Sequence, residues 1–521
     1  MIIPFVFTLD TVGDGCQLTW VFNKAVSFSK NYEWPVIAQK QYFDHYLEDT
    51  SVQNAEYSDY DVPQPEFLSK ITSIIIPEEL VENYISKFPS QIDAYLNSVR
   101  YEWKEMTEFL IDVIYQVEKK YGEKVEAIMS MRYYKFLNEA CINCGVSTLY
   151  YEWGPFRAPN YRNTAYLDFK GLQGNASIKE NYILFKEQLE KQEIPILNSK
   201  EILSLFLKRD KLNYLWKNVI PEYEIGITAG YTTPCVTTPY NAITLDEMVY
   251  RSRKIFQPNE ISIRLHPGDP LKTQPSYGQV DSGELLDFIL KSKRIVCNGS
   301  NMAYEAALYN RPTYDLGWSQ FSFMVNTTLN GLEDKVPDKQ VLSFVAFGAL
   351  IPFELLNSVE YLRFRLNKPS LVEIYLYHLR YYLESYGANL DLLNKSNFME
   401  QLCEMRLHSK GVLDVSAEFQ KYYSFSLDEI KYQKMKNDFL NLQAENRTYM
   451  NLLKEQKCHM EEQNKKITEL QNLLRLSNNR IQFIEDEKEN AENNLKVMMD
   501  SNIYKATKPL RMTLDTLKKM F

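Results

Sequence analysis

The sequence predicts an α/β fold, with two doubly wound domains in tandem, a helical region and a long C-terminal helix. Short apolar runs alternate with helical patterns through residues 1–345, which is typical of βαβ units and of parallel sheets covered on both faces. The stretch 412–508 contains no Gly and no Pro, so nothing in it breaks a helix. A chain of 521 residues has room for this plan, because domains usually take about 100–200 residues each.

The elements are expected in a regular order along the chain. Strands are expected where short apolar runs are bounded by turns: Ile2–Phe7, Ser73–Ile76, Ser147–Tyr151, Ile225–Thr228, Ile261–Leu265, Ile295–Cys297 and Thr313–Leu316. Helices are expected where apolar residues recur at helical spacing: 85–120, 132–143, 245–256, 282–292 and 301–309. The chain is therefore divided into two domains at 1–205 and 206–345, a helical region at 346–425, a coiled coil at 426–500 and a last helix at 501–521.

A heptad repeat runs through residues 439–498. With Phe439 at position a, thirteen of the eighteen a and d residues are apolar, which is the pattern of a coiled coil. The polar exceptions weaken the association but fix its register; they are Asn446, Gln456, Gln463, Ser477 and Lys488. The alternative is a single amphipathic helix that folds back on the globular part.

The last 21 residues, 501–521, differ from the rest of the chain in charge. They carry five Lys and Arg against one Asp, whereas the whole chain has a net charge of −9. Leu510, Leu514, Leu517 and Phe521 fall on one face of a helix that begins near Pro509. An apolar stripe beside basic residues suits an anionic membrane surface. The alternative is a solvated end of the coiled coil.

Composition excludes several classes of protein. Hydrophobic residues make up 45% and charged residues 24%, as in globular rather than disordered chains. The acidic net charge argues against a nucleic-acid binder, because phosphate binding needs a concentrated basic surface. Seven Cys in so long a chain do not form a disulfide framework, which fits the cytoplasm. The N-terminus is expected to be a buried strand rather than a signal peptide, and no apolar run reaches the ~18 residues of a membrane span.

Three segments that follow expected strands carry residues suited to chemistry, because open α/β sheets bind ligands at the carboxyl ends of their strands. In Tyr150–Arg157, Glu152 precedes a Gly-Pro turn and is placed to take a proton from a hydroxyl. The alternative is a structural ion pair of Glu152 with Arg157 or Arg162.

The second segment ends an apolar strand with Arg264, Leu265 and His266, followed by Pro267. Pro267 stiffens the turn, so that His266 is expected to point outward and donate to a phosphate or leaving group. A partnered surface histidine is the alternative.

The third segment runs from a strand through Gly299, Ser300 and Asn301 into a helix that contains Glu305. Backbone N–H groups and a Ser hydroxyl at a helix start can hold an anion, and Glu305 can reach ribose hydroxyls. A plain Ser or Asn helix cap is the alternative.

In this order the three segments resemble the bacterial capsule and lipopolysaccharide transferases that use CMP-activated nonulosonic or ulosonic acids. The resemblance is closest to the β-Kdo transferases of capsule synthesis, and it covers residues 130–320. The segments that carry it are Glu152-Trp153-Gly154, Arg157, Tyr166–Gly171 with Asp168, His266-Pro267, Ser300-Asn301, Glu305-Ala306-Ala307-Leu308, Arg311-Pro312 and Leu316-Gly317.

The resemblance implies a GT-B glycosyltransferase, with an acceptor domain at 1–205 and a CMP-sugar domain at 206–345. Glu152 and His266 are then the expected catalytic residues. The residues expected to bind substrate and nucleotide are Arg157, Asp168, Arg264, Pro267, Gly299, Ser300, Asn301 and Glu305. No metal or other cofactor is expected, because no Asp-x-Asp pair stands at a strand end and helix and His donors can carry the phosphate charge.

The expected partners follow from the same resemblance. The donor is CMP-Kdo, and the acceptor is a lipid-linked surface glycan, either O-antigen or capsule. The protein is expected in the cytoplasm, peripheral on the inner membrane through 501–521, with the coiled coil associating with itself or with a partner transferase.

The sequence departs from the family at two places. Asn301 stands where Ser or Thr is usual, and the loop Gly230–Pro239 lacks the carboxylate that retaining members are thought to use. The stereochemistry therefore stays open. The alternatives are a sialyltransferase or another CMP- or CDP-donor transferase, and a coiled-coil scaffold with a degenerate transferase domain.

Overall fold

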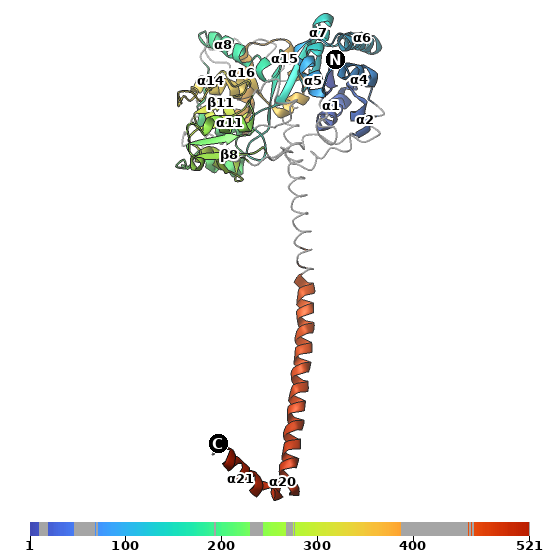
Figure 1. Ribbon diagram of the computed structural model, residues 1–521. Helices are drawn as coiled ribbons and strands as arrows, with labels where there is room; N and C mark the ends of the chain where they lie inside the picture. Colours follow the sequence, from blue (N-terminus) through green and yellow to red (C-terminus); the bar gives the residue numbers. More distant parts are fainter. Residues whose placement is uncertain are drawn as a thin grey trace. The chain divides into compact units, whose positions relative to one another are not determined.

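The computed structural model describes residues 1–9, 19–45, 68, 71–191, 194–229, 243–266, 275, 277–386, 457, 460 and 463–519 (Figure 1). The contacts between residues divide the chain into two units, Met1–Ala444 and Glu445–Phe521. Both sheets of the protein belong to the first unit. Pro267, the loop 230–242 and the coiled-coil residues 439–456 lie outside the described residues.

The first sheet has seven strands in the order β12-β6-β5-β4-β1-β2-β3. The strands are β1 Ile2–Val6, β2 Val36–Gln39, β3 Ser73–Ile76, β4 Ala127–Ser130, β5 Ser147–Trp153, β6 Thr164–Asp168 and β12 Leu350–Pro352. The five strands from β3 to β5 are parallel, and β6 pairs antiparallel with both β5 and β12. β1 and β4 are buried at every residue, as expected for strands covered on both faces.

Eight helices of the described residues accompany the first sheet, and the long helix expected at 85–120 is divided among them. They are α1 Thr19–Tyr32, α2 Lys40–His45, α4 Glu78–Ile85, α5 Gln91–Arg100, α6 Lys104–Tyr121, α7 Lys135–Cys144, α8 Ile178–Leu189 and α9 Ser199–Phe206. The expected helix at 85–120 is interrupted, because Pro89 cannot continue a helix and the Ser90 side chain caps α5 by accepting from Asp93 N.

The second sheet has five parallel strands in the order β11-β10-β7-β8-β9. The strands are β7 Ile225–Thr228, β8 Ile261–Arg264, β9 Gln279–Val280, β10 Ile295–Cys297 and β11 Thr313–Asp315. They alternate with the helices α11 Leu245–Ser252, α12 Leu285–Lys291 and α13 Met302–Leu308. In both sheets the first strand lies in the middle and the order reverses beside it, which is the doubly wound arrangement. The predicted α/β class with two such sheets is confirmed.

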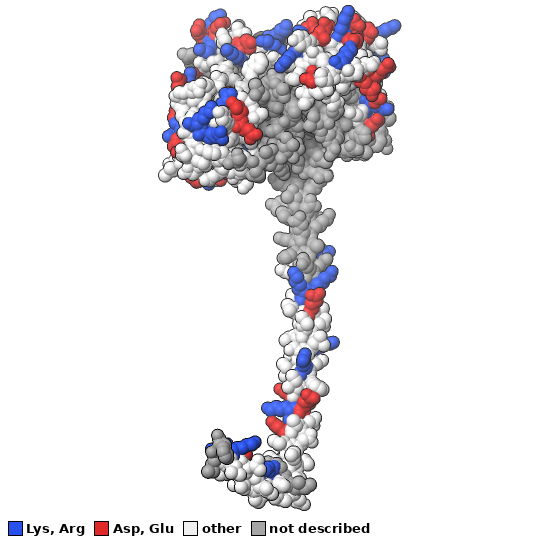
Figure 2. Space-filling view, viewed as in Figure 1, with Lys and Arg blue, Asp and Glu red and all other residues white. Residues whose placement is uncertain are grey.

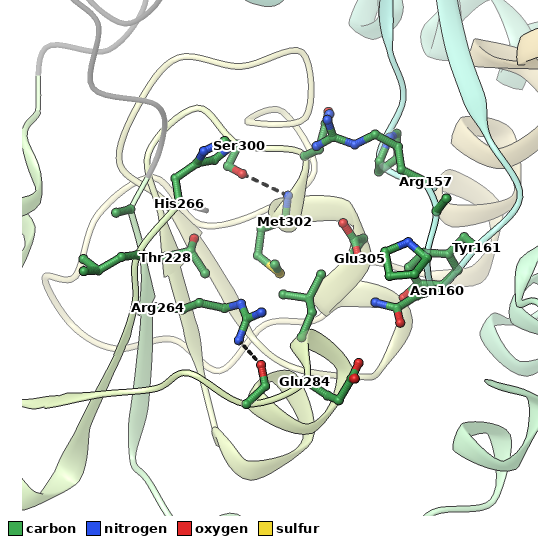
Figure 3. A pocket seen from close by; sticks show the side chains of 18 residues that line it. Arg157, Asn160, Tyr161, Thr228, Arg264, His266, Glu284, Ser300, Met302 and Glu305 are labelled. Carbon is green, nitrogen blue, oxygen red and sulfur yellow. Dashed lines mark hydrogen bonds between the residues drawn. The ribbon is translucent and has the colours of Figure 1, made fainter. Parts of the chain in front are cut away.

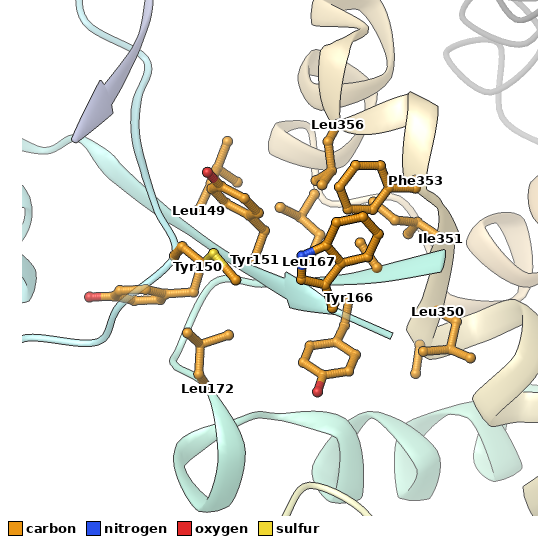
Figure 4. Packing of buried hydrophobic residues seen from close by; sticks show 14 of the residues in the cluster. Leu149, Tyr150, Tyr151, Tyr166, Leu167, Leu172, Leu350, Ile351, Phe353 and Leu356 are labelled. Atoms are coloured by element: carbon orange, nitrogen blue, oxygen red, sulfur yellow. The ribbon is translucent and has the colours of Figure 1, made fainter. Parts of the chain in front are cut away.

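The chain returns to the first sheet after completing the second. β12 pairs with β6, so that Leu350 faces Tyr166 in the register. Around this pairing a cluster of apolar side chains is buried (Figure 4), in which the Trp153 and Phe353 rings stack with their centroids 3.9 Å apart. The expected helical region, 346–425, contributes α15 Val359–Leu366 and α16 Leu371–Tyr386 to the same core, and α14 Lys339–Phe344 precedes it. Residues 346–386 therefore pack as part of the globular unit.

In the second unit a helix covers 463–500 and ends at the bend of Ser501. Two short helices follow, α20 Asn502–Ala506 and α21 Lys508–Lys518, and Pro509 lies in the first turn of α21. Every described residue from 463 to 500 is exposed. Figure 2 shows basic and acidic side chains interspersed along this helix, with large uncharged areas between them. Among the described residues, no helix is both long enough and apolar enough to cross a membrane.

Candidate active site

A cavity of about 380 Å³ opens at the carboxyl edge of the second sheet (Figure 3). Thr228 and Ala229 at the end of β7 and Ser300 after β10 line it. β7 and β10 are the neighbouring strands between which the order of the second sheet reverses, and open α/β sheets bind ligands at that point. The loop after β5 of the first sheet supplies the opposite wall, from Pro155 to Tyr161.

Six of the ten residues that the sequence predicts for the site line this one cavity. They are Arg157, Arg264, His266, Ser300, Asn301 and Glu305. Glu152, Asp168 and Gly299 are not among its lining residues, and Pro267 lies outside the described part of the chain. Each of the three sequence segments therefore contributes to the cavity: the first through Arg157, the second through His266 and the third through Ser300.

Asp168 holds a turn together. Its carboxylate accepts hydrogen bonds from Lys170 N at 2.7 Å, Gly171 N at 3.1 Å, and both N and Oγ of Ser177 at 2.8 and 2.6 Å. Asp168 is buried. These four hydrogen bonds give Asp168 a structural role in its own turn. Asp168 does not line the cavity.

Glu152 lies on β5, directly opposite Tyr166 of β6. Its Oε1 accepts from Trp153 N at 2.9 Å, and burial raises the pKa of the carboxyl, while the charges of Arg132 and Arg157 oppose that rise. A carboxyl with a raised pKa suits proton transfer. The structure shows no ion pair of Glu152 with Arg157 or Arg162 among the described residues.

Asn301 joins the second sheet to the first. Its Nδ2 donates to Trp153 O at 3.1 Å, and its Oδ1 accepts from Tyr166 Oη at 3.1 Å and from Gln320 Nε2 at 3.3 Å. The side chain is therefore already engaged by β5, β6 and the loop after β11. Contacts within the protein therefore account for an amide at this position.

The loop before α13 is shaped by an acid that the sequence does not single out. Gly299 has a φ of 60° and donates its N–H to Asp315 Oδ1 at 2.6 Å. Asp315 is fully buried and also accepts from the hydroxyls of Ser319 and Ser322. Ser300 Oγ in turn accepts from Met302 N at 3.2 Å, whereas Asn301, the N-cap residue of α13, makes no side-chain capping hydrogen bond. Asp315 is an acid within the expected strand Thr313–Leu316 and ends β11, which is the signal that could have identified it.

The two arginines of the cavity differ in how they are held. Arg264 Nη1 donates to Asp281 Oδ1 at 2.9 Å and to Gly283 O at 2.6 Å, which fixes its guanidinium. Among the described residues, no side chain pairs with the guanidinium of Arg157, which is half-buried. The cavity therefore has one positioned cation and one whose charge is not neutralised by a neighbouring carboxylate.

Glu305 is buried at the inner end of the cavity with two tyrosines that the sequence reasoning missed. Burial raises the pKa of Glu305 to about 8, and Arg157 is the charge that most opposes that rise. Tyr161 and Tyr309 are its hydroxyl neighbours, and burial raises the pKa of both. Nothing in the sequence around either tyrosine marks it, because only the packing of the two sheets brings them together. In the described part of the chain, no group of three His, Cys, Asp or Glu side chains is placed to hold a metal ion.

Residues 5–177 match the family model described as the Glycosyltransferase 99 family N-terminal domain. The matched residues span the first sheet from the end of β1 through β6. No curated protein matches the sequence. The family match supports a glycosyltransferase, and therefore a nucleotide-sugar donor and a glycan acceptor.

Several solved structures are distantly similar to the chain. The β-Kdo 2,7 transferase KpsC of Thermosulfurimonas dismutans is 13% identical with a TM-score of 0.32, over 56% of this chain and 87% of that chain. MurG of Acinetobacter baumannii is 10% identical with a TM-score of 0.24, over 81% and 98%. The UDP-GlcNAc 2-epimerase of Methanocaldococcus jannaschii, in complex with UDP-GlcNAc and UDP, is 11% identical with a TM-score of 0.27, over 66% and 97%. Likenesses of this size assign neither donor nor acceptor to the present chain.

Proposed function

We propose that the protein transfers a Kdo-type sugar from CMP-Kdo to a lipid-linked surface glycan at the inner membrane. The observation that carries the donor assignment is the pair of guanidinium groups in one cavity, Arg264 held by Asp281 and Arg157 with no partner among the described residues. A CMP-ulosonic acid presents two anionic groups, a phosphate and a sugar carboxylate. Arginine recognises both through paired N–H donors.

The residues divide the work in the following way. Arg264 and His266 hold the phosphate, and Arg157 holds the sugar carboxylate from the wall that the first sheet supplies. An acceptor hydroxyl oxygen forms a bond to the anomeric carbon, the bond from that carbon to the phosphate oxygen breaks, and CMP leaves. Donors from Arg264 and His266 stabilise the charge that develops on the phosphate. Glu152, whose pKa is raised by burial, is the proposed base for the acceptor hydroxyl; because Glu152 does not line the cavity, this role requires the acceptor to approach along the end of β5.

Turnover of two donors tests the proposal directly. Release of CMP is measured with CMP-Kdo and with CMP-sialic acid, for the full chain and for R157A. The control is R251A, which removes a surface arginine paired with Glu247 at 2.9 Å. We expect CMP-Kdo to be preferred, R157A to lose about 10–100-fold in kcat/KM through loss of a charge-assisted contact, and R251A to match the parent.

The other outcomes separate the alternatives. Preference for CMP-sialic acid identifies a sialyltransferase. Turnover of neither donor, together with unchanged surface glycan in cells that carry H266A, favours a scaffold with a degenerate site.

We also propose that α21 contacts the inner membrane. Leu510, Leu514 and Leu517 are exposed on α21, beside Lys508 and Lys518. Co-flotation with vesicles of anionic phospholipid compares the full chain with a chain that ends at Asp500. We expect only the full chain to float, and flotation of the truncated chain contradicts the proposal.

A further inference from the structure

Glu305 combines three features that are rarely found together. Glu305 is 5% exposed, it lines the cavity, and among the described residues no group makes a hydrogen bond of ordinary geometry to its Oε2, although the Tyr161 hydroxyl lies next to the carboxyl. Figure 3 shows the carboxyl between Met302 and the wall that carries Arg157 and Tyr161. A buried polar atom without a partner carries the full cost of its desolvation, so such atoms are usually satisfied by a ligand or by water.

Four side chains interact with the Glu305 carboxyl. Two are hydroxyls, those of Tyr161 and Tyr309, and two are guanidinium groups, those of Arg157 and Arg264. His266 and the exposed Glu284 line the same cavity. Two acids on elements packed against α13 have partners of their own. Glu201 on α9 forms a capping box with Asn198, and Asp315 at the end of β11 accepts from Gly299 N.

Arg157 and Glu305 line the same cavity but form no ion pair. This observation distinguishes an ionised Glu305 carboxylate from a neutral Glu305 carboxylic acid. An ionised, buried Glu305 would need a cation in contact to offset its desolvation, and it would cancel the positive charge of Arg157. A neutral Glu305 needs no cation, and it leaves that charge to a ligand. Burial shifts the pKa of Glu305 to about 8, in the direction that the neutral state requires.

We propose that Glu305 acts as a neutral carboxylic acid that donates a hydrogen bond to an anionic oxygen of the bound donor, next to the guanidinium of Arg157. No covalent bond changes in this step, because the proton stays shared between the Glu305 carboxyl and the ligand oxygen. The anionic oxygen belongs either to the phosphate or to the sugar carboxylate. The identity of the ligand rests on the proposed function, whereas the protonation state of Glu305 does not.

The proposal fixes the sign of a pH dependence. The carboxyl is neutral below its pKa and donates; above that value it is charged and repels an anion. Anion binding is therefore strong near neutral pH and is lost as the pH rises through about 8. One pH unit higher, about one tenth of the carboxyl is still protonated, so binding is about tenfold weaker.

Calorimetric titrations of the full chain test this with two probes. CMP carries the phosphate without the carboxylate, and free Kdo carries the carboxylate without the phosphate. Each is titrated from about pH 7 to about pH 9.5 into the parent, E305Q and E305A, because glutamine is a neutral donor of nearly the same shape. The control is E79Q, at an exposed glutamate of α4 that does not line the cavity.

We expect the parent and E79Q to lose affinity with rising pH for at least one probe, and that probe identifies the anionic group. E305Q should bind it within about threefold of the parent at neutral pH and with a flat profile, because an amide donor does not titrate in this range. If E305Q and E305A bind the probe equally weakly at neutral pH, the proposal is overturned, because the negative charge of Glu305 rather than a neutral donor would then support binding. An alkaline loss that persists in E305Q would overturn it as well.

Infrared titration of the protein without ligand separates this inference from the proposed function. A protonated-carboxyl band that disappears with a midpoint near pH 8 and is missing from E305Q supports a neutral Glu305, even if neither probe binds. If neither probe binds, the CMP-Kdo assignment fails. If the band is absent from the parent, the inference about Glu305 fails whatever the probes do.

Discussion

The two units of the molecule use their apolar side chains in opposite ways. In the first unit Leu286 and Leu308 are at most 1% exposed, and each sheet is covered by helices of the same unit. In the helix at 463–500, Leu474 is 63% and Ile484 55% exposed. A contiguous apolar surface on a single chain marks a site of association. The described part of the first unit therefore buries a large apolar core, whereas the helix at 463–500 leaves its apolar face exposed.

We expect a second copy of the same helix to cover that face. In the predicted heptad Ile467, Leu474 and Ile481 occupy a positions, and Leu470 and Ile484 occupy d positions. All five are more than half exposed in the single chain. A parallel pair in register would also place Arg480 at g opposite Glu485 at e of the second copy, which is an attractive pair. Self-association through this helix stays a prediction. If it holds, the second unit buries its apolar residues only between copies, whereas the first unit buries them within one chain.

The largest effect is expected from breaking the seam. I481N combined with I484N removes two apolar residues per copy, each worth about 2 kcal/mol when buried. Analytical ultracentrifugation should show a monomer where the parent associates. The melting temperature of the first unit should not change, and a fall in it would mean that this helix supports the globular core.

The next effect belongs to the first unit. D315A leaves Gly299 N and the hydroxyls of Ser319 and Ser322 without their buried acceptor. Removing one partner of such a buried network costs about 3–5 kcal/mol, so we expect chemical denaturation to show a loss of that size. Association through the helix should stay as in the parent, and D315A with the stability of the parent would contradict the account of this loop.

A smaller loss is expected where two strands approach closely. At Gly154 a Cβ atom would overlap Thr164 Oγ1, and Gly154 N also donates to Thr164 O at 2.8 Å. G154A should therefore cost about 1–3 kcal/mol through overpacking. G283A is the matched control, because the nearest atom to its Cβ would lie 3.6 Å away. Equal stability of the two variants would show that β5 and β6 can move apart.

The smallest effect tests the register of the helix. Lys488 occupies an a position, where a polar residue specifies pairing at a cost in stability. K488L should tighten self-association by about tenfold, or about 1.4 kcal/mol. Sedimentation of the parent and of K488L at equal concentration measures this. Weaker association of K488L would place residue 488 outside the seam.

The seven expected strands all correspond to strands of the structure, whereas β2, β4, β6, β9 and β12 were not expected. Ser73–Ile76 and Ile225–Thr228 have the expected bounds. β12 was missed, because three residues within a helical region carry no period and pair only by tertiary contact. In the site, residues that end strands could be predicted, since parallel strands bring their carboxyl ends to one edge. Tyr161 and Tyr309 could not, because only the packing of α13 against the first sheet's loop places them beside Glu305.

β12 has a consequence for the order in which the protein forms during synthesis. Strand β6 receives its outer neighbour only from residues Leu350–Pro352, which follow the whole second sheet. An unpaired strand edge is a template for wrong pairing. The nascent first sheet must therefore wait, with one edge open, until the second sheet has left the ribosome. Fragments that stop before Leu350 should aggregate during expression, even though they contain the entire domain that the family model matches.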